Sequence, residues 1–238
     1  MYVIIYLQMY FTKIRKKEML DLVTLVEYGD AEKIKEFLSI DGINPNVIDN
    51  HSGQTPLHLA VDLCLPEIVK QLMMHPETNP NTFNTNGFSP FHQAVYNQDK
   101  ECVELILNSN KFVDINLQTR CSNRRTVLHM TETEEILRLL LTRSDLMVNI
   151  KDARGQTPLH LFSYRRGGEC EDVTTYFGEN LIPILLEERP DVDPFLLDKA
   201  GKSAYDTAQE WERDEYGEYE KLTIKETILE FQQTKYPS

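Results

Sequence analysis

Four histidines offer the most chemistry in this chain, because imidazole is a common metal ligand and a general acid or base near neutral pH. Each ends a similar tetrapeptide, and the first residues of successive tetrapeptides are 34, 37 and 31 residues apart; the histidines are His58, His92, His129 and His160. Stacked repeats would place them on the order of 10 Å apart, whereas a zinc ligand lies about 2 Å from its metal. This spacing indicates structural histidines and predicts neither a metal site nor catalytic residues.

Other arrangements that support catalysis do not stand out. Gly167-Gly168 lacks the Lys and Ser or Thr of a phosphate-binding loop. No Ser–His–Asp or Cys–His arrangement is recognisable. The four cysteines form no CxxC pair and have no metal-ligand spacing; they are Cys64, Cys102, Cys121 and Cys170. We therefore expect no enzymatic activity and no cofactor.

The histidine tetrapeptides belong to a longer repeat. Its copies are Thr55-Pro56-Leu57-His58, Ser89-Pro90-Phe91-His92, Thr126-Val127-Leu128-His129, Thr157-Pro158-Leu159-His160 and, more weakly, Ser203-Ala204-Tyr205-Asp206. A turn containing Asn and Gly, such as 149–155, precedes the copies, and a second apolar helix, such as 67–72, follows them. Thr or Ser can cap the first helix and Pro suits its first turn, while the Leu or Phe is predicted to pack inward.

This pattern resembles the ankyrin repeat family, whose units contain T-P-L-H-x-A. The chain has Thr-Pro-Leu-His-Leu-Ala at 55–60 and Ser-Pro-Phe-His-Gln-Ala at 89–94. The resemblance implies an all-α fold, an ankyrin-repeat solenoid of helix pairs with short β-hairpin or turn tips. We expect about six units over residues 18–233 with degenerate end units, an N-terminal extension at 1–17 and a tail at 234–238.

The resemblance also implies roles for two kinds of repeated side chain. The histidines would hydrogen-bond within and between neighbouring units. An asparagine also precedes each turn, and its simplest interpretation is a turn-forming side chain satisfied locally. In ankyrin repeats an asparagine at this position can be hydroxylated, and Asn149 is the best match; the asparagines are Asn46, Asn81, Asn116 and Asn149.

Three segments depart from the repeat. Thr126 to Glu135 leaves too little room for a full first helix and loop, which predicts a shortened fourth unit. The fifth unit has about twelve extra residues near 165–178, and such insertions fall in loops, often on the working face. The stretch 210–220 contains six acidic residues and one Arg. It is interpreted either as a solvated loop or as a docking site for a basic peptide.

The residues that the repeat does not need are the candidates for partner binding. The resemblance implies that turn tips and the exposed side of each first helix form a concave face, and Tyr, Trp and Arg dominate interface hot spots. The alternative is that some of these aromatic residues pack between units. The predicted partner-binding residues are Leu63, Phe83, Phe88, Tyr96, Arg120, Arg125, Lys151, Arg154, Tyr164, Arg165 and Trp211.

Charge and composition narrow the choice of partner and compartment. The formal net charge of −13 disfavours nucleic acid and favours a partner with a basic segment. Residues 1–11 are apolar but too few to span a bilayer as a helix, so no membrane span is expected. Widely spaced cysteines predict free thiols in a reducing compartment. We expect a cytoplasmic monomer, with nuclear entry left open.

The function predicted from these observations is non-catalytic binding of a partner protein. Two narrower hypotheses remain. The first is an inhibitor similar to the IκB type that holds a transcription factor in the cytoplasm, suggested by about six repeats and Thr-Pro-Leu-His-Leu-Ala-Val-Asp-Leu at 55–63. The second is an adaptor or effector that targets another protein.

Overall fold

The computed structural model describes residues 22–49, 52–164, 181–210 and 221–235, and within these ranges the regular structure is helical, with no strand. Residues 22–27 form a first helical segment. The later helices are α2 (Ala31–Leu38), α3 (Pro56–Asp62), α4 (Pro66–Met74), α5 (Pro90–Tyr96), α6 (Lys100–Leu107), α7 (Val127–Met130), α8 (Glu134–Leu141), α9 (Pro158–Tyr164), α10 (Leu181–Glu188), α11 (Ala204–Glu210) and α12 (Lys221–Lys235). The all-α prediction is confirmed. The tips contain turns without assigned strands, whereas β-hairpins were the alternative predicted for them.

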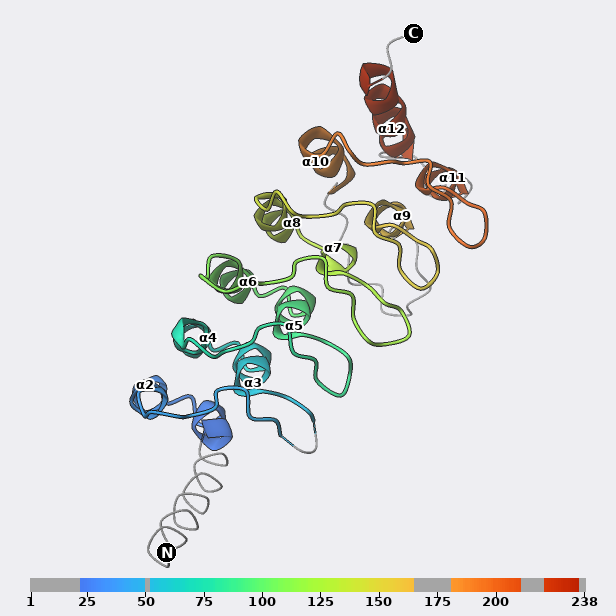
Figure 1. Cartoon of the computed structure of the whole chain (residues 1–238). Coiled ribbons are helices and arrows are strands. Elements are labelled where there is room, and N and C mark those ends of the chain that lie inside the picture. Colours follow the sequence, from blue (N-terminus) through green and yellow to red (C-terminus); the bar gives the residue numbers. More distant parts are fainter. Residues whose placement is uncertain (1–21, 50–51, 165–180, 211–220, 236–238) are drawn as a thin grey trace, which may run out of the picture. The chain divides into compact units, whose positions relative to one another are not determined.

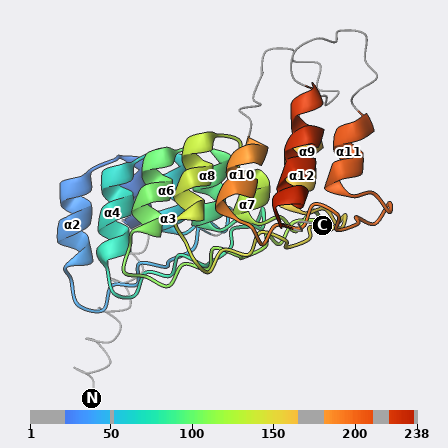
Figure 2. The ribbon, with the colours of Figure 1, turned by 90° about the horizontal axis from the view of Figure 1, so that it is seen from above.

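The chain divides into two compact units, one reaching Asp114 and the other starting at Ile115. In the first unit, α3 and α5 are the first helices of their repeats, and α2, α4 and α6 are second helices. Figures 1 and 2 show α2, α4 and α6 side by side as one layer, while α3 contacts α5 in the other layer. Each first helix also contacts the second helix of its own repeat. The apolar core lies between the layers.

The second unit repeats this arrangement with two variations. Helix α9 contacts both α7 and α11, while α10 contacts α8 and α12, so first and second helices again form separate layers. Helix α7 has only four residues, as the short spacing predicts, and Thr131 ends it in an extended conformation. Helix α12 has 15 residues and is the longest of the numbered helices. The predicted insert at 165–178 and the extension at 1–17 lie outside the described residues.

The tetrapeptide starts each first helix as its chemistry predicts. The Thr55 side chain accepts a hydrogen bond from the backbone N–H of His58, and Ser89 does the same for His92. In return, the backbone N–H of Thr55 donates to Nδ1 of His58, and that of Ser89 donates to Nδ1 of His92. A capping pair of this kind stabilises a helix start by about 1 kcal/mol. The third tetrapeptide residue then enters the core, and Leu57, Phe91, Leu128 and Leu159 are all at most 2% exposed.

The first helix of a repeat ends in a left-handed turn that leads directly into the second helix. Cys64 has a φ of 52° and Gln98 a φ of 54°, where the first repeat has Gly29 at 68°. The N–H of Cys64 donates to Val61 O and that of Leu65 to Ala60 O, the two bonds of a Schellman motif. A residue with a side chain is strained in this conformation. The turn nevertheless forms in all three repeats because it supplies hydrogen-bond donors to two backbone carbonyls at the end of the helix, such as those of Ala60 and Val61.

Candidate protein-binding surface

The repeated histidines join neighbouring repeats. The Nε2 atom of His58 lies 3.0 Å from Phe88 O, that of His129 3.0 Å from Gln156 O, and that of His160 3.2 Å from Lys202 O. A carbonyl can only accept and the N–H of Thr55 can only donate, so in His58 Nε2 carries the proton and Nδ1 accepts. The ring is neutral, and burial lowers the pKa of His58 to about 4. The predicted bonds within and between units are confirmed.

The repeated asparagines also bridge repeats, and the prediction that their own turns satisfy them was wrong. Asn81 Nδ2 donates to Phe112 O at 2.8 Å, and its Oδ1 accepts from the N–H of Asp114 at 2.9 Å. Asn149 bonds in the same way to Asp191 O and to the N–H of Asp193, at 2.8 and 3.0 Å. Asn46 and Asn116 repeat both contacts. The amide fits because one side chain can satisfy a carbonyl and an N–H together.

The side chains with catalytic potential are thus used in packing and hydrogen bonding. Within the described ranges, no group of three or more His, Cys, Asp and Glu side chains is placed to hold a metal. The described cysteines, Cys64, Cys102 and Cys121, are free thiols, and burial raises the pKa of Cys102. The residues whose types the fold does not explain lie at the surface.

In the first unit, three large side chains are exposed at the ends of first helices. Leu63 follows α3 and is 45% exposed, and Tyr96 ends α5 and is 65% exposed. Tyr28 is 80% exposed and precedes Gly29 just as Leu63 precedes Cys64. Sequence reasoning missed Tyr28 because its unit lacks the tetrapeptide, but the Tyr-Gly-Asp step before α2 was an available signal. These three residues form the helix-end face.

Aromatic residues of the turn tips adjoin this face. Phe88 is half-buried and packs edge-on against Tyr96, with ring centroids 5.9 Å apart. Phe83 is also half-buried, while Ile48 occupies the same position two residues after the bridging asparagine and is 55% exposed. Ile48 was also missed, although this shared position could have identified it. The structure therefore brings together the predicted Phe88 and Tyr96, and it identifies Ile48 and Tyr28 as further exposed apolar residues of the first unit.

The predicted residues of the second unit differ in their surroundings. Arg125 is half-buried, and its Nε lies 3.7 Å from Oδ2 of the buried Asp152. Lys151 is exposed, and its ammonium donates to Leu197 O at 2.8 Å. Arg120 and Arg154 are exposed. Arg165, Trp211 and the Tyr164 side chain, together with the acidic stretch 211–220, lie outside the described residues.

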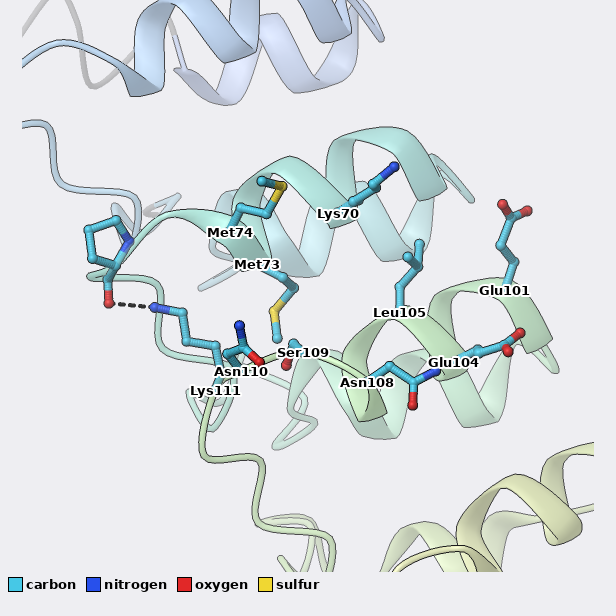
Figure 3. Close-up of a pocket in the computed structure, with 11 residues that line it drawn as sticks. Lys70, Met73, Met74, Glu101, Glu104, Leu105, Asn108, Ser109, Asn110 and Lys111 are labelled. Atoms are coloured by element: carbon cyan, nitrogen blue, oxygen red, sulfur yellow. Dashed lines mark hydrogen bonds between the residues drawn. The ribbon is translucent and has the colours of Figure 1, made fainter.

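A groove of about 760 Å³ lies on the opposite layer of the first unit, between α4 and α6. Figure 3 shows Met73, Met74 and Leu105 beside it, with Glu101 toward one end and Lys111 at the other, where the Lys111 ammonium donates to Pro76 O. Its one hydroxyl-bearing side chain, Ser109, donates to Ile106 O at 2.8 Å, and its lining contains no histidine. The groove therefore has no nucleophile paired with a base.

These features define a class of protein: a repeat scaffold whose polar side chains hold repeats together and whose exposed apolar and basic side chains are left to contact other molecules. Residues 22–119 match the family model of ankyrin repeats in three copies, and the tetrapeptide continues through 126–129 and 157–160. Residues 22–119 are therefore ankyrin repeats. Ankyrin repeats are protein–protein interaction modules. None of the helices in the described ranges is long and apolar enough to cross a membrane.

Known proteins share this repeat at modest identity. The chain is 30% identical over 128 residues to the human transient receptor potential cation channel subfamily A member 1, covering 53% of this chain and 11% of that protein. It is 29% identical over 194 residues to the nuclear factor NF-kappa-B p105 subunit of Gallus gallus, covering 76% and 19%. The chain thus spans less than a fifth of either relative. The crystal structure of the ankyrin repeat domain of Bcl-3, a member of the IkappaB family, has a TM-score of 0.68 at 20% identity, covering 87% of this chain and 81% of that one.

Proposed function

We propose that this protein is non-catalytic and binds a partner protein through the helix-end face and the neighbouring turn tips. The observation that carries the proposal is the exposure of Tyr28, Leu63 and Tyr96 at three successive helix ends. Single exposed apolar residues are common, but three at the first-helix ends of adjacent repeats offer a surface that a partner can cover. Their contribution to folding is small at this exposure, so a binding role explains them better than packing does.

Quantitative affinity capture tests this proposal. The full chain and the variant Leu63→Ser/Tyr96→Ser are used as baits, and the captured proteins are compared by mass spectrometry. Phe112→Ser is the matched control, because Phe112 is 78% exposed and follows the second helix α6 instead of a first helix. We expect a specific set of proteins to be lost with the double variant and retained with the control. Equal capture by all three baits would contradict the proposed face.

An inhibitor of the IκB type is the first narrower function. It is favoured by the similarity to the p105 subunit over 194 residues and to the Bcl-3 ankyrin domain in fold. In this function the protein would hold a transcription factor in the cytoplasm. Direct binding of the purified chain to an NF-κB subunit, measured by calorimetry, tests it. An adaptor or effector is the second narrower function, and capture of a protein unrelated to transcription would favour it.

Further properties follow as proposals from the same surface. The net charge of −13 supports a partner with a basic segment, for which the acidic stretch 210–220 is the candidate site. We also propose a cytoplasmic monomer with access to the nucleus, which light scattering and imaging test. Asn149 remains a candidate for hydroxylation, detectable as the mass of one added oxygen atom. Partner binding on the remaining predicted residues, Tyr164, Arg165 and Trp211, is tested by the same capture experiment.

A further inference from the structure

The turn tips of the second unit carry cationic side chains, while those of the first unit carry none. In the first unit, the tip sequences 46–55 and 81–89 contain no Lys or Arg. In the second unit, exposed cations occupy all three tips, before α7, α9 and α11; they are Arg120, Arg124, Lys151, Arg154 and Lys199. The tips precede the same first helix in every repeat, and the tips without cations also form, so the turn itself does not require the charge.

Backbone hydrogen bonds place these cations on adjoining tips. The N–H of Ala153 donates to Asn123 O at 2.8 Å, and the N–H of Lys199 donates to Arg154 O at 3.0 Å. The first bond joins Asn123 and Ala153, which directly precede Arg124 and Arg154. The second bond joins Arg154 and Lys199 themselves. Figure 1 shows the loops before α9 and α11 next to each other. Arg124, Arg154 and Lys199 therefore form a row across the second unit, which we name the basic ridge.

The carboxylates at these tips are used elsewhere. Asp152 is buried, and its Oδ1 accepts from the N–H groups of Arg154 and Gln156, while Oδ2 faces Arg125. Asp198 Oδ1 likewise accepts from the N–H groups of Ala200 and Lys202. Both acids stabilise the turns, and Asp152 also faces Arg125.

Two of the exposed cations, Arg124 and Lys151, have neutral partners. Arg124 Nη2 donates to the amide oxygen of Gln118 at 3.2 Å, and Lys151 donates to a backbone carbonyl. Among the described residues, no carboxylate lies within ion-pair distance of Arg154 or Lys199. The positive charge of the ridge is therefore available to a ligand.

We propose that the basic ridge binds an acidic segment of a partner protein, an extended stretch with several Asp or Glu residues. This inference rests on the proposed protein-binding function and specifies the partner chemistry at the tips of the second unit. Arginine suits the task because its guanidinium can bind a carboxylate through two parallel hydrogen bonds. The net charge of −13 does not prevent this, because at physiological salt charges beyond about 8 Å are largely screened. Because ankyrin repeats are protein–protein interaction modules, a protein segment is favoured over nucleic acid.

Fluorescence anisotropy with a defined probe tests the ridge. The probe is a labelled peptide of alternating Glu and Gly, and the same peptide with Gln in place of Glu is its neutral counterpart. The full chain is compared with the variant Arg124→Gln/Arg154→Gln/Lys199→Gln. The control variant Lys35→Gln/Lys70→Gln/Lys100→Gln removes the same charge from exposed positions on second helices. Unchanged thermal melting of both variants establishes that the fold is retained.

We expect the Glu peptide to bind in preference to the Gln peptide and to weaken as salt rises. The ridge variant should bind the Glu peptide about tenfold more weakly, and the control variant about as tightly as the parent. Equal weakening in both variants, or stronger binding of a single-stranded oligonucleotide than of the Glu peptide, would overturn the proposal. If the peptide fails to bind while the Leu63→Ser/Tyr96→Ser variant still loses captured proteins, the ridge inference fails and the proposed function stands.

Discussion

Acidification should destabilise this protein well before its carboxylates titrate, because burial lowers the pKa of His58 and of His160. His58 is fully buried, donates through Nε2 to Phe88 O and accepts at Nδ1 from Thr55 N–H, so protonating Nδ1 would break a bond. Its pKa falls from 6.5 to about 4 on folding. Between these values the unfolded chain binds a proton that the folded chain does not, so stability must fall as pH falls.

The magnitude follows from the shift. Each unit of pKa corresponds to about 1.4 kcal/mol, so His58 alone should remove about 3 kcal/mol between pH 6.5 and pH 4. Burial also lowers the pKa of His160, which adds a loss of the same sign. The carboxyls of Asp30, Asp145 and Asp206 have lowered pKa values, through hydrogen bonds to Lys33, Arg143 and Ser203 respectively. Their stabilising effect is lost only below about pH 4. The pH range in which the histidines destabilise the protein is therefore separate from that of the carboxyls.

Urea denaturation between pH 7.5 and pH 4 measures this effect. The free energy of unfolding should decline steadily below pH 6.5 in the parent. A His58→Gln variant should be less stable at pH 7.5 but should lose less on acidification, since one titrating group is gone. A flat profile from pH 6.5 to pH 4.5, or equal slopes in parent and variant, would refute the neutral, buried state of this imidazole.

Three further predictions concern stability. Leu159→Ala should cost about 2–5 kcal/mol of unfolding free energy, and hydrogen exchange should rise in the adjoining repeats as well as in α9; a rise confined to α9 would contradict this coupling. Asn81→Ala removes two bridging hydrogen bonds and should cost about 1–3 kcal/mol in urea denaturation; an unchanged midpoint would show the bridge to be dispensable. Cys64→Gly relieves a residue at φ 52° and should stabilise by about 0.5 kcal/mol after the entropy cost of glycine; a fall in thermal midpoint would refute the strain.

The helix starts could be predicted from sequence because their chemistry is local. Thr55 and Ser89 cap helices whose first residue is Pro, and each capping contact lies within four residues of the chain. The burial of Leu57 and Phe91 follows from their place as the second residues of these helices. Periodicity and cap chemistry thus determine where each helix begins and which side chain it buries.

The bridges could not be predicted in this way because they join residues about 30 to 44 positions apart. Asn149 shows the limit well. Its local turn offers a plausible partner for the amide, yet the next repeat supplies both a carbonyl and an N–H in suitable positions. Only the stacking of two repeats decides between these partners. The pairing of Arg125 with buried Asp152 could not be predicted for the same reason, because the sequence alone indicates only a cation at a turn tip.

Each turn contains conserved hydrogen-bonding positions and a variable position, so one fold can present different surfaces. The bridging asparagine and the capping side chain three residues later, such as Asn46 and Asp49, are engaged in hydrogen bonds that every repeat needs. The residue between them, two after the asparagine, varies: it is Ile48 and Phe83 in the first unit but Gln118 and Lys151 in the second. Both second-unit side chains donate to a backbone carbonyl of the following repeat. Substitution at this position changes the surface while leaving the bridges intact. The bridges do not require the exposed Ile48 of the first unit, which supports the proposal that a partner covers this tip.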